Sequence, residues 1–481
     1  MLNLKSLSKD KIKKFPALEE GQTFWTIAAN GKIKINQFRL IRFLQKGGFY
    51  KIATKSNKSV VRVVENIVSE APDHEMIDYI KKFLASKNEI DVLETFSTGV
   101  SGYINKGKTN LLASVNIPID KDPKDESWFY FKNTAVKVTI QGIDLVKYKD
   151  LPNKIWESRI LDRDFIISDG TKSDFETFLF NLAGQDNERF IALKSIIGYL
   201  LHRFQDKSTT KAIIFVDENM SLDGKANGGT GKTLITEATG KMRELVGVDG
   251  KNIKTKSWFK NQRITRTTDL VRYDDVQRDF SLETLFSMIT SGISVEKKHK
   301  DEFYISPENA PKFIISSNYP VKGTGGSTDL RRRCEFEVAN HYDSNHQPID
   351  DFGALFFDGW NNKQWNQFDE FMMSCAMLYL EKGLITPEPI NIVKNKLVSN
   401  TCVEFVDFMN DSIGLNKWID KRVFQKDFME KYSIHNGITP HQFTKWIKAF
   451  ADQKNLEYED KSSGGNYSFI LKTIKKDEDE E

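Results

Sequence analysis

The chain has 481 residues, of which 39% are hydrophobic and 28% are charged, and its formal net charge is +3. This length is too great for one ordinary hydrophobic core and predicts roughly two to four domains. The net charge is too small to identify a nucleic-acid partner from composition alone. The three cysteines are too far apart to indicate a disulfide framework or a zinc module, and no apolar segment is long enough to cross a bilayer, so we expect no membrane partner.

The N-terminal third mixes short strand-like runs with one amphipathic helix over residues 73–84, which predicts an α+β domain whose role the sequence leaves open. A rolling-circle nickase needs clustered metal-binding histidines, but His74 is the only histidine before His202. Asp120 and Asp122 lie in a loop with lysine and proline, and we interpret this acid pair as a solvated turn rather than a metal site.

Apolar residues then recur at helical spacing between residues 174 and 204. This pattern predicts a small helical collar ahead of the next motif. Such stripes also occur wherever a helix packs into a core, so the pattern alone does not establish a role in assembly.

A phosphate-binding loop is the strongest motif of the chain. Residues 226–233 read Ala-Asn-Gly-Gly-Thr-Gly-Lys-Thr and lie between an apolar run, 211–217, and a helix-like stretch. Small residues let several backbone N–H groups approach a triphosphate, while Lys232 reaches the outer phosphates and Thr233 offers a hydroxyl to Mg²⁺. We expect ATP to contact Asn227, Gly228, Gly229, Thr230, Gly231, Lys232 and Thr233. Ala226 replaces the usual first glycine.

Two carboxylates follow the next apolar run, at Asp274 and Asp275. A strand that ends here would deliver both side chains to the edge of an α/β sheet where ligands bind. We expect Asp274, together with Thr233, to hold Mg²⁺, and Asp275 to orient or deprotonate the attacking water. An acid pair alone is a weak signal, and its spacing after the phosphate loop is what strengthens it.

Residues 292–305 alternate apolar and polar side chains around a charged tip and predict a β-hairpin. The tip carries Lys297, Lys298, His299 and Lys300, which are candidate DNA contacts; a solubilising hairpin tip is the alternative.

The apolar run 312–317 ends at Asn318, whose amide could position the hydrolytic water. Three consecutive arginines follow at 331–333. An arginine supplied by a neighbouring subunit can stabilise the negative charge that develops during phosphoryl transfer. Surface or intersubunit ion pairing is the alternative for at least one of the three.

The C-terminal region reads as three helices and a hairpin, 403–410, 422–431, 440–453 and 456–471, an order that fits a winged helix. In the third helix Phe443, Ile447 and Phe450 would pack inward, and the outward face would carry Gln442, Lys445 and Lys448. DNA contact by this module and a purely protein-contact role both stay open.

From phosphate loop to arginine cluster, about residues 210–338, the chain resembles the superfamily 3 helicases of small DNA viruses, phages, plasmids and mobile elements. The resemblance implies an AAA+ type α/β core, a homo-hexameric ring and a hairpin tip that grips DNA with Lys298 and His299. It also implies that Asn318 is the sensor asparagine and that Arg332 or Arg333 is the arginine finger. Helical collars serve assembly in this family, and its phage and poxvirus primase-helicase branch carries a similar C-terminal module.

The sequence therefore predicts an α/β AAA+ P-loop core with a helical collar, an N-terminal α+β domain and a C-terminal winged-helix-like domain. The expected segments are the N-terminal domain (1–169), the collar (170–208), the ATPase core (209–345), a helical linker (346–399), the winged-helix-like domain (400–473) and an acidic tail (474–481).

We expect a replicative DNA helicase that uses ATP and Mg²⁺ on single-stranded and forked DNA, with 3′-to-5′ movement implied by the resemblance. Its expected location is the cytoplasm of a bacterial host, or the nucleus or cytoplasm of a viral host, and a primase or other replication protein stays open as a partner. A nucleic-acid packaging or remodelling ATPase and a non-enzymatic replication-origin binding protein are the alternatives.

Overall fold

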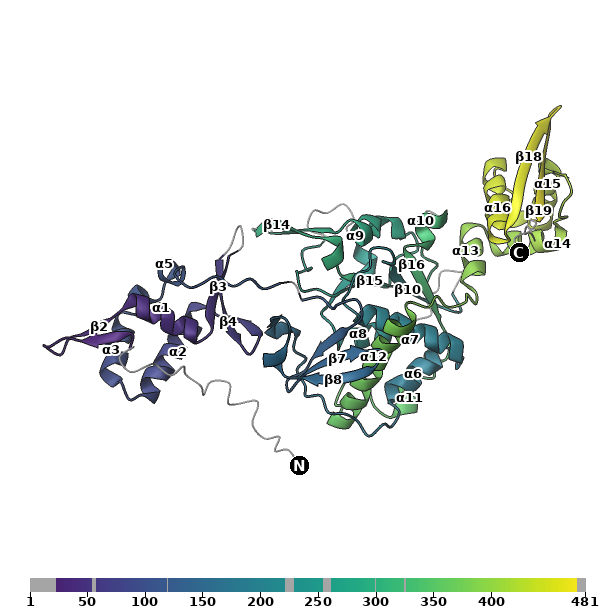
Figure 1. Cartoon of the computed structure of the whole chain (residues 1–481). Coiled ribbons are helices and arrows are strands. Elements are labelled where there is room, and N and C mark those ends of the chain that lie inside the picture. The colour runs from purple at the N-terminus through teal and green to yellow at the C-terminus, as the bar shows by residue number, and fades with distance from the viewer. Residues whose placement is uncertain are drawn as a thin grey trace, which may run out of the picture.

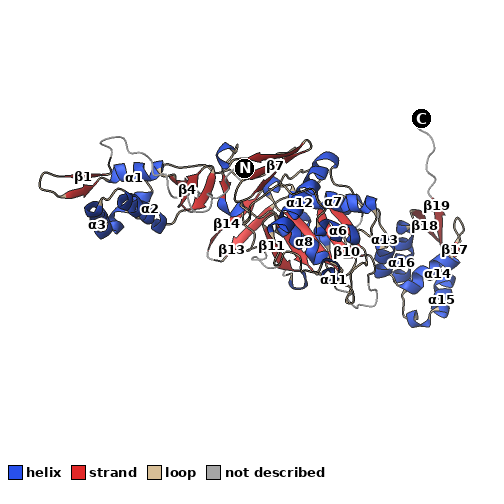
Figure 2. Cartoon of the chain, turned by 90° about the horizontal axis from the view of Figure 1, so that it is seen from below, coloured by secondary structure: helices blue, strands red, loops and turns tan. Residues whose placement is uncertain are grey.

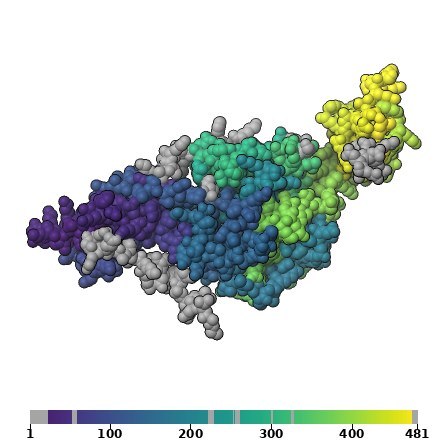
Figure 3. Space-filling model, viewed as in Figure 1, coloured from purple at the N-terminus to yellow at the C-terminus, as the bar shows by residue number. Residues whose placement is uncertain are grey.

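The computed structural model describes residues 23–53, 58–118, 120–220, 229–253, 261–298, 300–323 and 326–473. The chain is elongated, with an N-terminal part at one end, a large central body and a separate C-terminal part at the other end (Figure 1, Figure 3). The predictions for Asn227, Gly228, His299 and the acidic tail lie outside the described residues.

The N-terminal part is a mixture of helices and strands around a core of its own. Its elements are β1 (Trp25–Ile27), β2 (Ile33–Ile35), α1 (Gln37–Lys46), β3 (Phe49–Ala53), β4 (Lys58–Val64), β5 (Ile67–Glu70), α2 (Asp73–Ser86), α3 (Ile90–Thr98), α4 (Val100–Tyr103) and α5 (Lys106–Thr109). Helix α2 is the amphipathic helix that the sequence predicts, because Met76, Ile80 and Phe83 bury one face of it. Asp73 in its first turn complements the positive helix end.

A three-stranded antiparallel sheet follows and packs into the central body. It comprises β6 (Ser127–Tyr130), β7 (Ala135–Thr139) and β8 (Gly142–Val146), after which β9 (Ile155–Trp156) pairs with β5. Phe129 and Val136 share one hydrophobic core with the helices α6 (Asp174–Leu182), α7 (Asn187–Leu201) and α12 (Asn362–Lys382). This sheet therefore belongs by packing to the central body.

Helices α6 and α7 lie where the sequence predicts a helical collar. Both are largely buried in the central core, and α7 lies directly against α12. A Cβ at Gly198 would lie 2.0 Å from the carbonyl oxygen of Cys375, so the close approach of the two helices requires glycine there. Core packing thus accounts for the apolar stripe, and a role in assembly stays a prediction.

The central body is built on a five-stranded parallel sheet in the order β11-β12-β15-β10-β16. Its strands are β10 (Ala212–Asp217), β11 (Leu245–Asp249), β12 (Leu270–Asp274), β15 (Lys312–Ser317) and β16 (Arg333–Val338). Along β10, Ile213 and Phe215 enter the core shared with α7 and α12, while Ile214 and Val216 enter a second core on the opposite face. Both faces of the sheet are covered, as a parallel sheet requires.

Helix α8 (Lys232–Gly240) begins just after the phosphate loop and packs against β12 and β15, and Figure 2 shows it among the helices that lie over the central strands. The second face carries α9 (Phe286–Thr290) and the hairpin β13 (Ile293–Lys297) and β14 (Lys300–Ile305). The short helices α10 (Gly326–Leu330) and α11 (Pro348–Phe352) complete the body. The mixed α/β architecture with a parallel sheet is confirmed.

The C-terminal part has its own core and the predicted order of elements. They are α13 (Ile392–Asn400), α14 (Val403–Ser412), β17 (Ile419–Asp420), α15 (Lys421–Lys431), α16 (Pro440–Gln453), β18 (Leu456–Ser463) and β19 (Asn466–Thr473). Phe443, Ile447 and Phe450 are buried in α16, as its periodicity predicts. Within the described residues, no helix is long and apolar enough to span a membrane.

Candidate nucleotide-binding site

The phosphate loop lies at the carboxyl end of β10, which is an inner strand of the central sheet. Gly229 and Gly231 have φ angles of +97° and +95°, in the left-handed region that glycine adopts without strain. A Cβ at Gly231 would lie 2.9 Å from the ring of Phe178, so this glycine is also required by packing. Helix α8 begins at the next residue, and its positive end faces the loop.

Lys232 is held in a small cluster of polar groups and is only 8% exposed. Its Nζ donates hydrogen bonds to Thr230 Oγ1 at 3.2 Å and to Asn318 Oδ1 at 3.1 Å, and it forms an ion pair with Asp217. Thr230 also donates to Asp217 Oδ1 at 2.6 Å. The sequence interpretation missed Asp217, although it is the charged residue at the carboxyl end of the apolar run that precedes the loop.

The acid pair Asp274 and Asp275 lies at the end of β12, as predicted, and one serine connects the two residues. Ser316 Oγ donates to Asp274 Oδ1 at 2.7 Å and accepts the backbone N–H of Asp275 at 2.9 Å. Asp275 has a φ angle of +52°, so the bond to Ser316 helps to hold a strained backbone. Ser316 was not singled out from the sequence.

Asn318 links Lys232 with the acid pair. Its Nδ2 donates to Asp275 Oδ1 at 2.7 Å, while its Oδ1 accepts from Lys232. A continuous chain of polar contacts therefore runs from Asp217 through Lys232 and Asn318 to Asp275. The carboxyl ends of β10, β15 and β12 supply these groups, which is the edge of a parallel sheet where ligands bind.

Both acids also have cationic neighbours. Lys251 Nζ lies 2.5 Å from Asp275 Oδ2, and this hydrogen bond raises the pKa of Lys251. Arg272 lies 3.8 Å from Asp274 Oδ2 and donates to Thr236 Oγ1 at 3.0 Å. The two cations offset part of the repulsion between adjacent carboxylates.

The residues present fit a magnesium nucleotide. The carboxylates of Asp274 and Asp275 are 35% and 38% exposed, so both can reach a ligand at the sheet edge. Thr233 is exposed in the first turn of α8. Carboxylate and hydroxyl oxygens are the ligands that Mg²⁺ prefers, and a lysine beside glycine-rich backbone suits phosphate oxygens.

The structure separates the two arginines that the sequence left as alternatives. Arg333 is buried and forms ion pairs with Asp329 at 3.0 Å and Glu335 at 3.1 Å, and it donates to two backbone carbonyls. Arg332 is partly exposed, donates to Thr328 O at 2.8 Å, and lies 5.0 Å from the centre of the Phe286 ring. Ion pairing within the chain therefore accounts for Arg333.

Arg332 and Arg333 lie at the amino end of the parallel strands, whereas the phosphate loop follows their carboxyl end. Arg333 pairs with Ala212 at the start of β10, whereas the loop follows the other end of that strand. Five residue steps along a strand span about 17 Å, which exceeds the length of an arginine side chain. Neither arginine can reach the phosphate loop of its own chain.

The predicted hairpin is confirmed. β13 and β14 pair in antiparallel register, with Lys297 opposite Lys300 and Lys298 in the turn. The ammonium of Lys297 lies 5.8 Å from the centre of the Phe303 ring. The hairpin extends from the central body (Figure 1), and its role in binding DNA stays a prediction.

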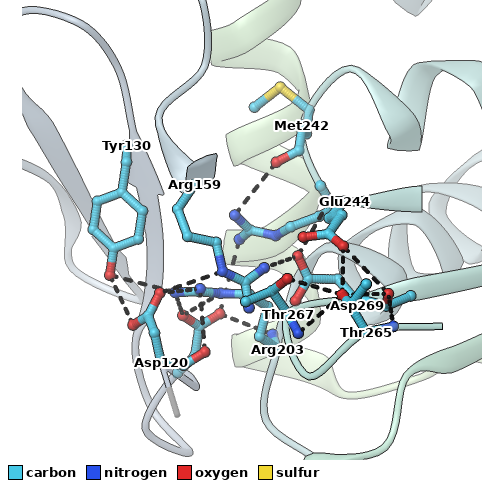
Figure 4. A network of polar contacts seen from close by, with 12 residues as sticks. Asp120, Tyr130, Arg159, Arg203, Met242, Glu244, Thr265, Thr267 and Asp269 are labelled. Atoms are coloured by element: carbon cyan, nitrogen blue, oxygen red, sulfur yellow. Dashed lines mark hydrogen bonds and ion pairs between the residues drawn. The ribbon is translucent and has the colours of Figure 1, made fainter. Parts of the chain in front are cut away.

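The interpretation of Asp120 and Asp122 as a solvated turn is wrong, because both carboxylates are buried in an ion network (Figure 4). Arg203 forms ion pairs with both, and its Nη2 lies 2.7 Å from Asp122 Oδ1. Burial raises the pKa of Asp122, but Arg203 and Arg243 lower it more, so it lies well below its usual range. The arginines come from distant segments, which a local motif cannot reveal.

The same network reaches the amino end of β12 through Asp269, the residue before this strand. Arg159, which follows β9, forms an ion pair with Asp269 and lies 3.9 Å from Asp120 Oδ2. The network therefore connects the segment after the three-stranded sheet to the strand that ends at Asp274 (Figure 4).

A sequence family described as a family of unknown function (DUF5906) matches residues 222–333, and no curated protein matches the chain. Among solved structures, the apo C-terminal region of NrS-1 is similar at 14% identity and a TM-score of 0.43, covering 90% of this chain and 99% of that one. JCV helicase is similar at 11% identity and a TM-score of 0.27, covering 50% and 61%. Drosophila ORC bound to DNA is similar at 11% identity and a TM-score of 0.19, covering 64% and 92%.

Proposed function

We propose that the chain is an ATP-dependent DNA helicase with an AAA+ type core that works as a ring of identical copies. The observation that carries this proposal is the polar chain at the carboxyl edge of the sheet, in which Asn318 contacts both Lys232 and Asp275. These are the groups that phosphoryl transfer to water requires: a phosphate-binding cation, a carboxylate and an amide that positions water.

Each residue has a distinct part in the proposed reaction. Lys232 binds the outer phosphate oxygens after its ammonium leaves Asp217, and the N–H groups at the start of α8 bind the remaining oxygens. When bound, Mg²⁺ neutralises charge on those oxygens, and Thr233 and Asp274 are the residues that would hold it. Asp275 accepts a proton from water, and Asn318 orients both the carboxylate and the water.

The position of Arg332 supports assembly into a ring. Because it cannot reach the phosphate loop of its own chain, it can stabilise transition-state charge only in the site of a neighbouring copy. A cavity of about 370 Å³ beside it is lined by Lys207, Thr210, Thr290 and Arg331 as well. Its cations and hydroxyls suit the phosphate groups of a nucleotide held by that copy.

The basic hairpin is the proposed DNA contact. Lys297 and Lys298 would bind the phosphates of a single strand, and hydrolysis in successive copies would move the hairpins and the strand through the ring. The 3′-to-5′ direction and the number of six copies rest on the family resemblance alone. A packaging or remodelling ATPase would use the same ATP site without separating strands.

The assignment of the hairpin is tested by replacing Lys298 and His299 with alanine. We expect basal ATP hydrolysis to be unchanged, because these residues lie outside the nucleotide site, and the unwinding of DNA to be lost. A matched control is Lys426→Ala, which removes an exposed lysine from the C-terminal part. Normal unwinding by the double variant would contradict the assignment.

A further inference from the structure

The C-terminal part contains a pocket to which the proposed ATPase mechanism gives no role. It has a volume of about 290 Å³ and lies between the first turns of α15 and α16 and the strand β19. Its lining includes Lys421, Arg422, His441, Phe443, Thr444 and Tyr467. Three of these side chains are basic and three are aromatic, with His441 belonging to both sets.

Arg422 and Tyr467 form the exposed rim of this pocket. The Tyr467 side chain is 43% exposed, and the guanidinium carbon of Arg422 lies 4.6 Å from the centre of its ring. Within the part of the chain that the structure describes, no carboxylate forms an ion pair with Arg422. The neighbouring Lys421, in contrast, pairs with Asp460 at 2.9 Å. Arg422 is therefore the cation of this pocket whose charge is least neutralised by the protein.

We propose that this pocket binds one nucleotide of single-stranded DNA, with the base stacked on Tyr467 and a backbone phosphate bound by Arg422. Exposed aromatic rings beside cations are how proteins hold unpaired bases without reading their sequence. The volume equals that of about ten water molecules, which is enough for a single planar base. His441 lies in the first turn of α16, where it can contact the same phosphate or the base.

The geometry favours a single strand over a duplex. Inside a duplex both faces of each base are covered by neighbouring bases, so a base reaches such a pocket only when it is unstacked. A duplex would instead meet the exposed face of α16, which carries Gln442, Lys445 and Lys448. The two modes of binding therefore depend on different residues.

This site does not depend on ATP hydrolysis, because none of its residues belongs to the nucleotide site. It would be a second binding site for single-stranded DNA, at the end of the molecule far from the N-terminal part (Figure 1). An experiment can therefore disprove single-strand binding at this pocket without disproving the proposed helicase activity, and the reverse.

The test uses the full-length protein with Lys297→Ala and Lys298→Ala, so that the hairpin does not mask the pocket. Binding of a fluorescent oligothymidine is measured by anisotropy without nucleotide. We expect Tyr467→Ala to weaken binding on the order of ten-fold and Tyr467→Phe to preserve it, because stacking needs the ring and not the hydroxyl. Arg422→Ala should weaken binding and reduce its dependence on salt.

Lys426→Ala is the matched control, since it removes an exposed lysine from the same helix as Arg422 outside the pocket. A 4-thiothymidine in the oligonucleotide should crosslink to the peptide that contains Tyr467. Unchanged affinity in Tyr467→Ala with no crosslink to this peptide would overturn the proposal. Equal competition by a duplex, lost in Lys445→Ala, would overturn it too and assign binding to the exposed face of α16.

Discussion

Among single residues, the candidate nucleotide site contains groups that bridge the residues of its motifs. Ser316 contacts both acids of the pair, and Asp217 contacts both Thr230 and Lys232. Neither residue has a motif of its own, because a serine or an aspartate at a strand end is common. Their role becomes visible only when β10, β12 and β15 lie side by side.

Ser316→Ala tests whether this bridge positions the acids. The substitution removes one hydrogen bond from Asp274 and leaves the backbone N–H of Asp275 without its acceptor. Groups that position metal-binding carboxylates typically change activity by about 10- to 100-fold, so we expect steady-state ATP hydrolysis to fall within that range while the fold is kept. Ser317→Ala is the matched control, because Ser317 is equally buried but contacts neither acid. Equal losses in both variants would contradict a positioning role.

Arg332→Ala tests whether this arginine acts on a neighbouring copy. We expect nucleotide binding to be kept and ATP hydrolysis to fall about 10³-fold or more. Mixing Arg332→Ala with Lys232→Ala protein should restore part of the activity, since mixed rings contain some intact sites. No recovery over a range of ratios would contradict action between copies.

Arg333→Ala should instead destabilise the fold by about 3–5 kcal/mol in denaturant titrations, since the buried carboxylate of Asp329 loses its partner.

At the scale of elements, the buried ion network fastens the segment after β9 to the start of β12. In Asp269→Asn the buried Arg159 loses its shorter ion pair and keeps only the 3.9 Å contact with Asp120, and we expect the free energy of unfolding to fall by about 3–5 kcal/mol in denaturant titrations. Asp162→Asn is the control, because Asp162 is exposed and pairs with Lys132 at 2.6 Å, so its loss should leave the free energy of unfolding nearly unchanged. Similar values for the two variants would contradict the importance of the network.

His202, at the end of α7 beside this network, should make the fold sensitive to acid. Burial lowers its pKa to about 4, and its Nε2 donates to Pro123 O at 2.8 Å. Since the unfolded chain binds a proton near pH 6.5 and the folded chain only near pH 4, the unfolding free energy should decrease as the pH falls between these values. We expect a loss of about 3 kcal/mol across this range and a flatter profile in His202→Gln. If the unfolding free energy of His202→Gln depended on pH as that of the native protein does, His202 would not be the source of the acid sensitivity.

At the scale of the whole molecule, the features with short sequence separation were the predictable ones. The hairpin around Lys298, the third C-terminal helix with Phe443 buried, and the strand ending at Asp274 follow from local periodicity. The solvated turn at Asp122 was wrong because its partner Arg203 comes from a helix end 81 residues later. Likewise, three adjacent arginines look equivalent until the pairing of β16 with β10 buries Arg333.

The packing of the three-stranded sheet against the central body also could not be predicted from the sequence. Phe129 and Val136 show strand periodicity, but nothing local indicates that they share a core with α12. Long-range packing of this kind depends on which faces remain uncovered once the parallel sheet has formed. The sequence therefore predicted the strands and the helix around the candidate nucleotide site well, but not the parts of the chain that pack against them.

Strand displacement on a forked duplex with ATP and Mg²⁺ would show whether ATP hydrolysis at this site separates DNA strands. Lys232→Ala is the control, because it removes the phosphate-binding cation from the polar chain. We predict that the native protein unwinds the fork and that the variant does not. Hydrolysis stimulated by DNA without displacement would contradict the helicase and favour a packaging or remodelling motor.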